Sequence, residues 1–162
     1  MSAAKNTNRE MPKTELLTTF HIGKDFYGIE VMKVQEVTNT PIVMPVPLAP
    51  KFVRGLINLR GQLATALGLR ELFELKDKES ENQMSVVCRM DGNLVSLMVD
   101  SIGDVVEAES KDFESCPDTM PIGVRQYMKG IYKMNGTLLS VLDLDKLSKE
   151  LSPSADVNDS RA

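Results

Sequence analysis

The 162-residue sequence contains no tryptophan, a single histidine and only two cysteines. With one histidine, a catalytic dyad has His21 as its only possible histidine base, and no serine or cysteine is an obvious partner for it. A zinc site would need more cysteine and histidine ligands at suitable spacing than the chain offers. The sequence therefore predicts no catalytic residue, no metal site and no cofactor.

The two cysteines are expected to be free thiols. Cys88 lies in the strand-like run SVVCRM, where a buried thiol is expected, and Cys116 precedes Pro117 in a polar segment. A disulfide between them is possible, but it would be unusual in a reducing compartment.

Long apolar runs and an excess of positive charge are also missing. No stretch approaches the roughly 18 consecutive apolar residues of a membrane helix, and residues 1–13 lack the apolar core of a secretory signal. The net charge of −4 and the pI near 5.1 disfavour a nucleic-acid partner. We therefore expect a globular cytoplasmic protein without direct membrane insertion.

What the chain does contain is an internal repeat. At an offset of 75 residues, the segment 54–72 (RGLINLRGQLATALGLREL) resembles the segment 129–147 (KGIYKMNGTLLSVLDLDKL). The shared positions are Gly55, Gly61, Leu63, Leu67, Leu69 and Leu72, over Gly130, Gly136, Leu138, Leu142, Leu144 and Leu147. A weaker match at an offset of 68 relates 26–37 to 94–105. Two similar units in the same order indicate two copies of one small supersecondary fold.

One residue breaks the repeat, because Arg60 has Asn135 as its counterpart. The repeated glycines are expected to serve the backbone, at positions that need φ > 0 or the close approach of another segment. These structural glycines are Gly55, Gly61, Gly130 and Gly136. An arginine in one copy only is a candidate for function, since its planar fork suits a carboxylate or a partner surface. A solvated turn arginine is the ordinary alternative.

Short strands are predicted along a folded domain at 15–151, between flexible tails at 1–14 and 152–162. The expected strands are 16–20, 25–30, 31–37, 56–59, 63–67, 85–90, 94–99, 105–108, 130–134 and 138–142. Prolines interrupt 41–50, a long loop is expected at 109–126, and a charged linker near 76–83 divides the two copies. Short helices are expected at 70–75 and at the end, 143–151.

This pattern predicts a mainly β fold of two small barrels, one for each copy. Neither copy is large enough to bury a sizeable core alone, so the two should pack together and leave a seam suited to binding. Methionine is abundant, with 10 residues. Met32, Met98 and Met134 are expected in the core, although some could line an adaptable groove.

Two motifs, KVQEV at 33–37 and NLRG at 58–61, introduce a resemblance to a known family. They are accompanied in order by the turn Tyr27-Gly28-Ile29, by Pro45 and Pro50, by VDSIGDV at 99–105 and by the second-copy segment 130–147. With these motifs in order over about 15–150, the chain resembles the CheW family of bacterial chemotaxis coupling proteins.

The chain departs from that family at one position. The segment after NLRG commonly holds an aspartate where this chain has Gly68, whereas the second copy keeps Asp143 at the equivalent place. We expect this difference to change the local geometry at the end of a strand, and the preferred partner could change with it, while the fold is retained.

The resemblance implies two five-stranded SH3-like β-barrels around a shared hydrophobic core, with short helices and a C-terminal helix. It also implies a non-catalytic adaptor that bridges the cytoplasmic tips of chemoreceptors and the regulatory domain of the histidine kinase CheA at membrane receptor arrays. By this resemblance Glu36, Arg60 and Val34 are receptor-binding residues. A Glu36–Arg60 ion pair, if exposed, would be worth only about 0–1 kcal/mol, so its use would be to orient a contact surface.

Two other functions remain open. A CheW-like adaptor of a receptor–kinase pathway for surface motility or development would share the same motifs. A metal-binding β-barrel enzyme would need a cation site built from aspartates at strand ends and at a helix start, where capping and turn roles are the ordinary explanation. Those aspartates are Asp100, Asp104, Asp143 and Asp145.

Overall fold

The computed structural model describes residues 13–39, 42–76 and 83–151. Residues 1–12 of the predicted N-terminal tail (1–14), the predicted tail at 152–162 and positions 77–82 of the predicted linker lie outside the described residues. The first described strand begins at Thr14, the last residue of the predicted N-terminal tail. The elements are β1 (Thr14–Ile22), β2 (Asp25–Glu30), η1 (Val31–Lys33), β3 (Val34–Thr38), β4 (Val53–Leu59), β5 (Gln62–Gly68), α2 (Leu69–Leu72), β6 (Met84–Met90), β7 (Asn93–Val99), β8 (Ser101–Glu109), η2 (Ser110–Asp112), β9 (Phe113–Glu114), α3 (Ile122–Arg125), β10 (Met128–Met134), β11 (Thr137–Leu142) and α4 (Leu144–Leu151).

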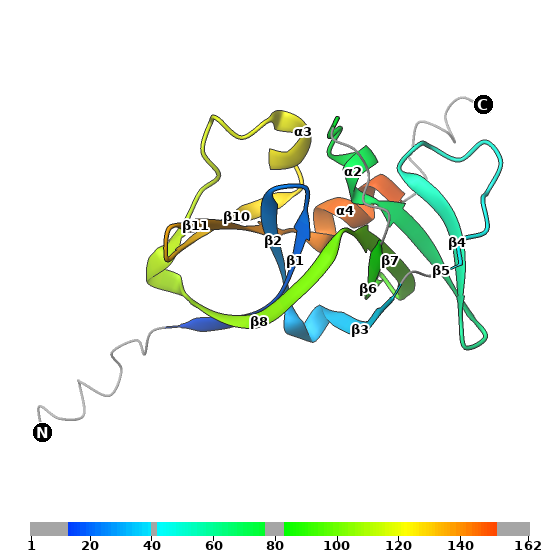
Figure 1. Cartoon of the computed structure of the whole chain (residues 1–162), viewed down its shortest axis with the longest axis horizontal. Helices are drawn as coiled ribbons and strands as arrows, with labels where there is room; N and C mark the ends of the chain where they lie inside the picture. The colour runs from blue at the N-terminus through cyan, green and yellow to red at the C-terminus, as the bar shows by residue number, and fades with distance from the viewer. Residues whose placement is uncertain (1–12, 40–41, 77–82, 152–162) are drawn as a thin grey trace, which may run out of the picture.

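The strands form two curled sheets that lie side by side (Figure 1). Sheet A has six strands in the order β8-β1-β2-β11-β10-β9, and sheet B has five in the order β3-β6-β7-β5-β4. The predicted mainly β fold with two SH3-like barrels is confirmed. Sheet A exceeds the predicted five strands because the two-residue strand β9 pairs with β10.

Each sheet takes strands from both copies of the repeat. Sheet A joins β1 and β2 of the first copy to strands β8 to β11 of the second, and sheet B joins β6 and β7 of the second copy to β3, β4 and β5 of the first. Position by position, β3-β6-β7-β5-β4 corresponds to β8-β1-β2-β11-β10, so the same small barrel is built twice. The prediction that each copy forms its own barrel is wrong.

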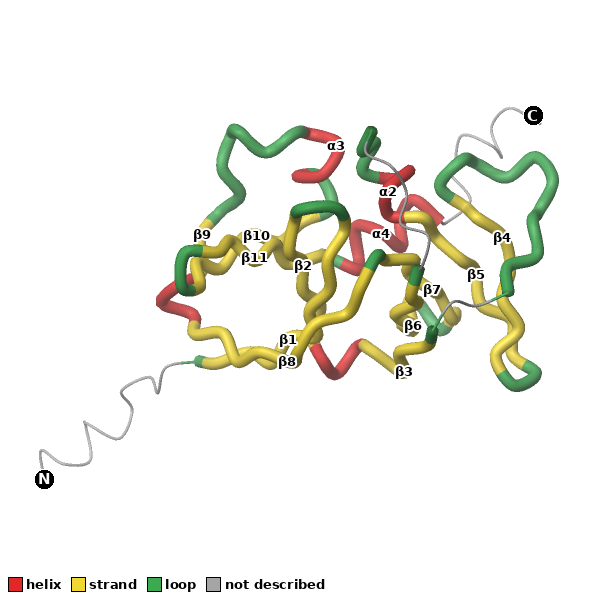
Figure 2. The backbone as a smooth tube through the Cα atoms, in the orientation of Figure 1, coloured by secondary structure: helices red, strands yellow, loops and turns green. Residues whose placement is uncertain are grey.

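Short connections explain this exchange. Only Asp100 separates β7 from β8, and the three residues of η1 separate β2 from β3. A two-residue loop is the shortest common hairpin connection, so β7 cannot turn back on itself and the chain runs on into the other sheet (Figure 2). The predicted boundary near 76–83 divides the copies, but β5 before it and β6 after it both belong to sheet B.

Among the described residues, the largest hydrophobic cluster extends over both sheets. Phe20 and Tyr27 of sheet A lie in the same buried cluster as Leu67 and Val86 of sheet B, and Leu147 of α4 closes it. Burying one such side chain contributes about 1.5–3 kcal/mol relative to leaving it exposed. The two barrels therefore stabilise each other through one shared interior.

Two of the repeated glycines lie where another segment comes very close. A Cβ on Gly55, whose φ is +147°, would collide with the backbone carbonyl of Met44. A Cβ on Gly130 would collide with the Phe113 ring and the Glu114 carbonyl oxygen. Glycine at these positions lets the loop before β4 and the short strand β9 pack directly on the neighbouring backbone.

Three local predictions are corrected by the structure. The run 31–37 is not one strand, because η1 occupies its first three residues and β3 begins at Val34. Met32, expected in the core, lies on η1 and is 90% exposed, whereas Met98 is buried and Met134 is half-buried. The predicted loop at 109–126 contains η2, β9 and α3.

Candidate functional site

The structure brings Glu36 and Arg60 together across sheet B. Glu36 lies on β3 and Arg60 lies at the tip of the β4–β5 hairpin, and β3 and β4 are the two outer strands of the sheet. A guanidinium N–H of Arg60 donates to Oε2 of Glu36. The Glu36 side chain is 22% exposed and that of Arg60 is 78% exposed. The carboxylate is thus seated in the surface, while the arginine projects from it and keeps donors free for another molecule.

Arg60 occupies an unfavourable backbone conformation. Its φ is +50° and that of the following Gly61 is +89°, as in a two-residue hairpin turn, and the second copy builds the same turn with Asn135 and Gly136. Asparagine tolerates this left-handed region, whereas other non-glycine residues lose about 1–2 kcal/mol there. Asn58 supports the strained turn by accepting a hydrogen bond from the Gly61 N–H at 2.9 Å. An arginine at this position therefore has no advantage for the local fold.

An apolar groove of about 380 Å³ lies beside this pair, between the end of β3 and the edge strand β4. It is lined by Thr38, Asn39, Ile42, Met44, Ile57, Asn58 and Leu59. Ile42 and Met44 expose large apolar surfaces. Within the part of the chain that the structure describes, the enclosed Thr38 hydroxyl has no hydrogen-bond partner.

Sequence reasoning missed Ile42 and Met44. Their signal was the placement of apolar residues among the prolines of 41–50, in a segment too irregular to bury them. Met44 is fixed by backbone hydrogen bonds to Leu56 in both directions, each 2.8 Å long. The loop before β4 therefore presents these side chains from a held backbone.

Val34 has a different environment from the other two predicted receptor-binding residues. It is half-buried, packs against the main core and pairs with Cys88 of β6. The register shifts between Val34 and Glu36, which marks a bulge in β3. Val34 therefore anchors the strand that carries Glu36, and a bulge re-aims the residues that follow it.

The two copies cap their helices differently, as the departure at Gly68 suggested. Asp143 precedes α4, and its Oδ1 accepts hydrogen bonds from the backbone N–H groups of Asp145 and Lys146 at 3.0 and 3.3 Å. Gly68 is the N-cap of α2 and has no side chain with which to do the same.

The Glu71 side chain lies where a side chain at position 68 would be, although it makes no cap hydrogen bond to α2. Its carboxylate folds back over the start of α2 and occupies the space that a Cβ on Gly68 would need. The same carboxylate accepts a hydrogen bond from Arg54 of β4 at 2.9 Å. A carboxylate near a helix N-terminus is electrostatically favourable, so α2 keeps a negative group there through a different residue.

Two of the aspartates considered as cation ligands, Asp100 and Asp143, accept hydrogen bonds from protein groups. Asp100 accepts two hydrogen bonds from Arg70, at 3.1 and 2.6 Å, and one from the Gly23 N–H at 2.6 Å. Burial alone would raise the pKa of Asp100, but the hydrogen bonds from Arg70 and Gly23 and the charge of Arg70 hold it below its usual range. Across 13–39, 42–76 and 83–151, no three histidine, cysteine or acidic side chains are grouped so that they could hold a metal ion.

The two cysteine thiols are protonated at neutral pH. Both cysteines are free; burial raises the pKa of Cys88 to about 12 and also raises the pKa of Cys116. His21 stacks on Phe26, with 4.7 Å between ring centroids. Among the described residues, no helix is long and apolar enough to span a membrane.

Two rigid barrels, a projecting charged pair and an adjacent apolar groove define a protein-interaction scaffold. Comparison with known proteins identifies the family to which this scaffold belongs. Residues 16–152 match the family model of the CheW-like domain. The chain belongs to the CheW family of chemotaxis adaptors, and the resemblance drawn from its motifs is confirmed.

Individual relatives agree with this assignment. The chain is 30% identical over 148 residues to "Chemotaxis protein CheW" of Treponema pallidum, covering 87% of each chain. It is 27% identical to the protein of the same name from Bacillus subtilis, over 90% of this chain and 95% of the relative. The solved structure of the scaffolding protein TtCheW from Thermoanaerobacter tengcongensis superimposes with a TM-score of 0.73 at 22% identity, covering 82% of this chain and 89% of that one, and so shares its fold.

Proposed function

We propose that this chain is a non-catalytic adaptor that couples chemoreceptors to the histidine kinase CheA in bacterial chemotaxis. It works in the cytoplasm, at membrane receptor arrays. Family membership supports the adaptor role, and relatives named as chemotaxis proteins support the pathway. The observation that carries the proposal is the exposed Arg60, which pairs with Glu36. Arg60 lies at a turn position with positive φ, where the second copy of the repeat has Asn135, a residue that tolerates this backbone better.

The receptor face consists of Val34, Glu36, Arg60 and the groove beside them. The apolar walls of the groove suit the apolar side chains of a helical hairpin tip, which would insert between Ile42 and Met44. Arg60 uses one part of its fork on Glu36 and has further N–H donors for carboxylate or carbonyl groups of the receptor. The ion pair holds the guanidinium in one orientation, which lowers the entropy lost when the receptor binds.

The kinase face is the exposed apolar surface of β5 and of the loop before β4. The outer side of β4 is already bridged by Met44 at Leu56, and the same loop leaves Val46 and Leu48 exposed. Leu63 on β5 is also exposed. Exposed apolar side chains of this kind are suited to a domain of similar β fold that packs against them. Receptor and kinase then contact different sides of the same barrel.

Coupling requires that the adaptor hold both partners at once. A signalling change in the receptor reaches the kinase only if at least one contact differs in free energy between the two signalling states. The shared core makes the barrels one rigid body, so a shift at the receptor face is transmitted to the kinase face as a whole.

The test is to measure receptor and kinase affinities separately. Arg60→Ala should weaken binding to a purified receptor cytoplasmic domain by about tenfold or more, as for a central arginine of an interface. Its free energy of unfolding should change by less than about 0.5 kcal/mol, because the side chain is exposed. Glu36→Ala should act similarly, and the double variant should cost less than the sum of the two. Kinase affinity should be retained in all three variants.

A matched control uses another exposed ion pair. Lys133 on β10 pairs with Glu114 at 3.1 Å, in sheet A and away from the receptor face. Lys133→Ala should leave both affinities unchanged, and Leu48→Asp should reduce kinase affinity while sparing the receptor. If folded Arg60→Ala binds the receptor as well as the unaltered chain does, Arg60 is not part of the receptor face.

A further inference from the structure

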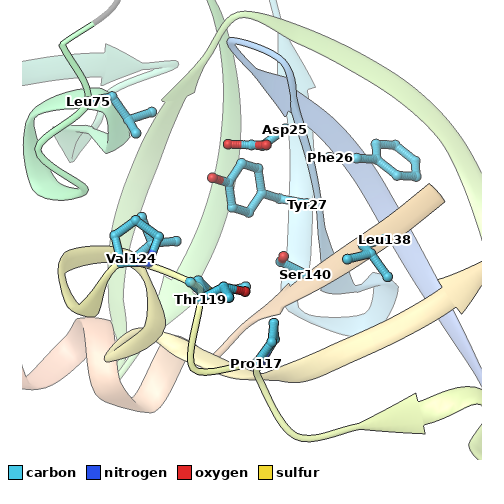
Figure 3. A pocket seen from close by; sticks show the side chains of 11 residues that line it. Asp25, Phe26, Tyr27, Leu75, Pro117, Thr119, Val124, Leu138 and Ser140 are labelled. Carbon is cyan, nitrogen blue, oxygen red and sulfur yellow. The ribbon is translucent and has the colours of Figure 1, made fainter.

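A second cavity, of about 250 Å³, opens at one end of sheet A and shares no lining residue with the groove beside the NLRG motif (Figure 3). Strands β2 and β11 form its floor, the segment 117–121 and α3 form one side, and Leu75 after α2 forms another. Its lining residues are Asp25, Phe26, Tyr27, Leu75, Pro117, Thr119, Met120, Pro121, Val124, Leu138 and Ser140. At roughly 30 Å³ for each water, this space holds about eight waters or one small organic molecule.

The hydroxyl groups of two largely buried residues line this cavity. Tyr27 is 1% exposed and Ser140 is 8% exposed, and the two are directly paired across the parallel strands β2 and β11. Within the described residues, neither hydroxyl oxygen is a fully enclosed atom without a partner, so both can be reached from the cavity and can donate or accept a hydrogen bond there. The burial of Tyr27 and the nearby Asp25 raise the pKa of its phenol, so it remains a neutral donor and acceptor.

The charge on the described lining of the cavity is negative and comes from Asp25. Among the residues that the structure describes, Asp25 is the one carboxylate in the lining and no lysine, arginine or histidine contributes to it. The Asp25 carboxylate lies beside the Tyr27 hydroxyl (Figure 3). An anion would meet this carboxylate without a compensating cation. A protonated amine, in contrast, could donate to both the carboxylate and the phenol oxygen.

We propose that this cavity binds a small organic ammonium compound, with its charged group between Asp25 and Tyr27 and its apolar body against Leu75, Met120 and Val124. The Ser140 hydroxyl serves a further polar substituent of the ligand. A ligand pocket with mostly apolar walls and a few converging polar groups has this character. The site is separate from the receptor face, so it does not depend on the adaptor proposal.

The test uses three probes of similar shape and different charge: benzylamine, benzyl alcohol and benzoate. Binding is followed by two-dimensional amide NMR of the full chain at neutral pH. Benzylamine should shift resonances of β2 and β11 in a saturable manner, benzyl alcohol should bind more weakly, and benzoate should not bind. Nα-acetyl-lysine amide carries the same ammonium on a flexible stem, and tighter binding of this probe would instead assign the cavity to a lysine side chain of a partner protein.

Conservative variants locate the site. Asp25→Asn removes the charge at an exposed position, and Tyr27→Phe removes a single hydroxyl, so both should fold. Each should weaken benzylamine binding, Asp25→Asn by about tenfold or more because a charge-assisted hydrogen bond is lost. Asp104→Asn, an exposed acid on β8 outside the cavity, is the matched control. The proposal is overturned if benzyl alcohol binds as tightly as benzylamine, if Asp25→Asn binds normally, or if no probe binds and the cavity holds water only.

Discussion

Arg60 lies in a turn whose backbone favours a different residue. The β4–β5 and β10–β11 hairpins have nearly the same backbone, with φ values of +50° at Arg60 and +38° at Asn135. Asparagine is the residue this turn favours, and the second copy has it. The NLRG motif accepts a local cost, and the proposed compensation lies in the contact that the projecting guanidinium makes.

This contrast predicts a variant that separates stability from binding. Arg60→Asn copies the second hairpin, so it relieves backbone strain while losing an exposed ion pair worth about 0–1 kcal/mol. The free energy of unfolding should stay the same or rise by up to about 1 kcal/mol, and receptor affinity should fall as it does for Arg60→Ala. Urea titration and receptor binding measure the two quantities. A loss of stability above about 1 kcal/mol would show that the arginine supports the turn.

At the scale of the element, α2 and α4 each have a carboxylate near the N-terminus, but the carboxylate comes from a different position in each helix. Asp143 supplies a conventional N-cap to α4, whereas Glu71 and Arg54 fill the space left open by Gly68 in α2. The motif comparison located the departure, but the compensating pair could not be predicted from sequence. Arg54 and Glu71 lie on different elements, and their contact depends on how β4 packs against α2.

A double-mutant cycle tests this compensation. Gly68→Asp alone should destabilise the chain or leave it unchanged, because the new side chain must displace the Glu71 carboxylate. In a Glu71→Ala background the same substitution should stabilise by about 1 kcal/mol, the usual value of an N-cap. Chemical denaturation of the four proteins gives the coupling free energy. Additive effects in the cycle would mean that Glu71 does not substitute for the missing cap.

The buried pair of Arg70 and Asp100 connects elements of both sheets. Arg70 lies on α2, Asp100 lies between β7 and β8, and the Gly23 N–H comes from the β1–β2 turn. The folded-state pKa of Asp100 is lowered. Its contribution to stability is therefore present above the unfolded-state pKa, about 3.9, and is lost as the pH falls through the lower folded-state value.

Asp100→Asn should consequently reduce the free energy of unfolding at neutral pH and flatten its dependence on acid. The substitution weakens the charge-assisted hydrogen bonds that Asp100 accepts from Arg70, and a hydrogen bond to a charged group contributes about 1.5–3 kcal/mol. Urea titrations between neutral pH and the acid limit of folding give both quantities. Asp104→Asn is the control, as an exposed acid on the next strand. If Asp100→Asn kept the slope of the unaltered chain, another group would account for the acid sensitivity.

At the scale of the whole molecule, the sequence supported the class of fold better than its connectivity. Alternating strands, glycine turns and the offset repeat predicted two small β-barrels, and KVQEV with NLRG predicted the family. The exchange of strands was not predicted, because it depends on connection length. The single residue Asp100 between β7 and β8 decides it, and sequence similarity between copies carries no information on which strands pair.

The site was predicted in part for a similar reason. Glu36 and Arg60 were identified through motifs, and the structure brings them together. The groove formed with Ile42 and Met44 depends on the path of an irregular, proline-containing loop. The exposure of Met32 depends on a three-residue helical turn that interrupts a run of strand-forming residues. These features depend on tertiary contacts, so local sequence patterns do not predict them.

The strand exchange predicts that the two halves of the sequence are unable to fold separately. A fragment ending at residue 76 has β1 and β2 without the rest of sheet A, and β3 has lost β6, which separates it from every other strand of sheet B. A protease site introduced between 76 and 83 tests this. The cleaved halves should stay associated and melt cooperatively, because the core lies between them, and each half purified in denaturant should remain unfolded on dilution. Mixing the two should restore the circular dichroism and amide NMR spectra of the uncut chain, which is the control. Cooperative unfolding of either half alone would show that one copy can close its own barrel.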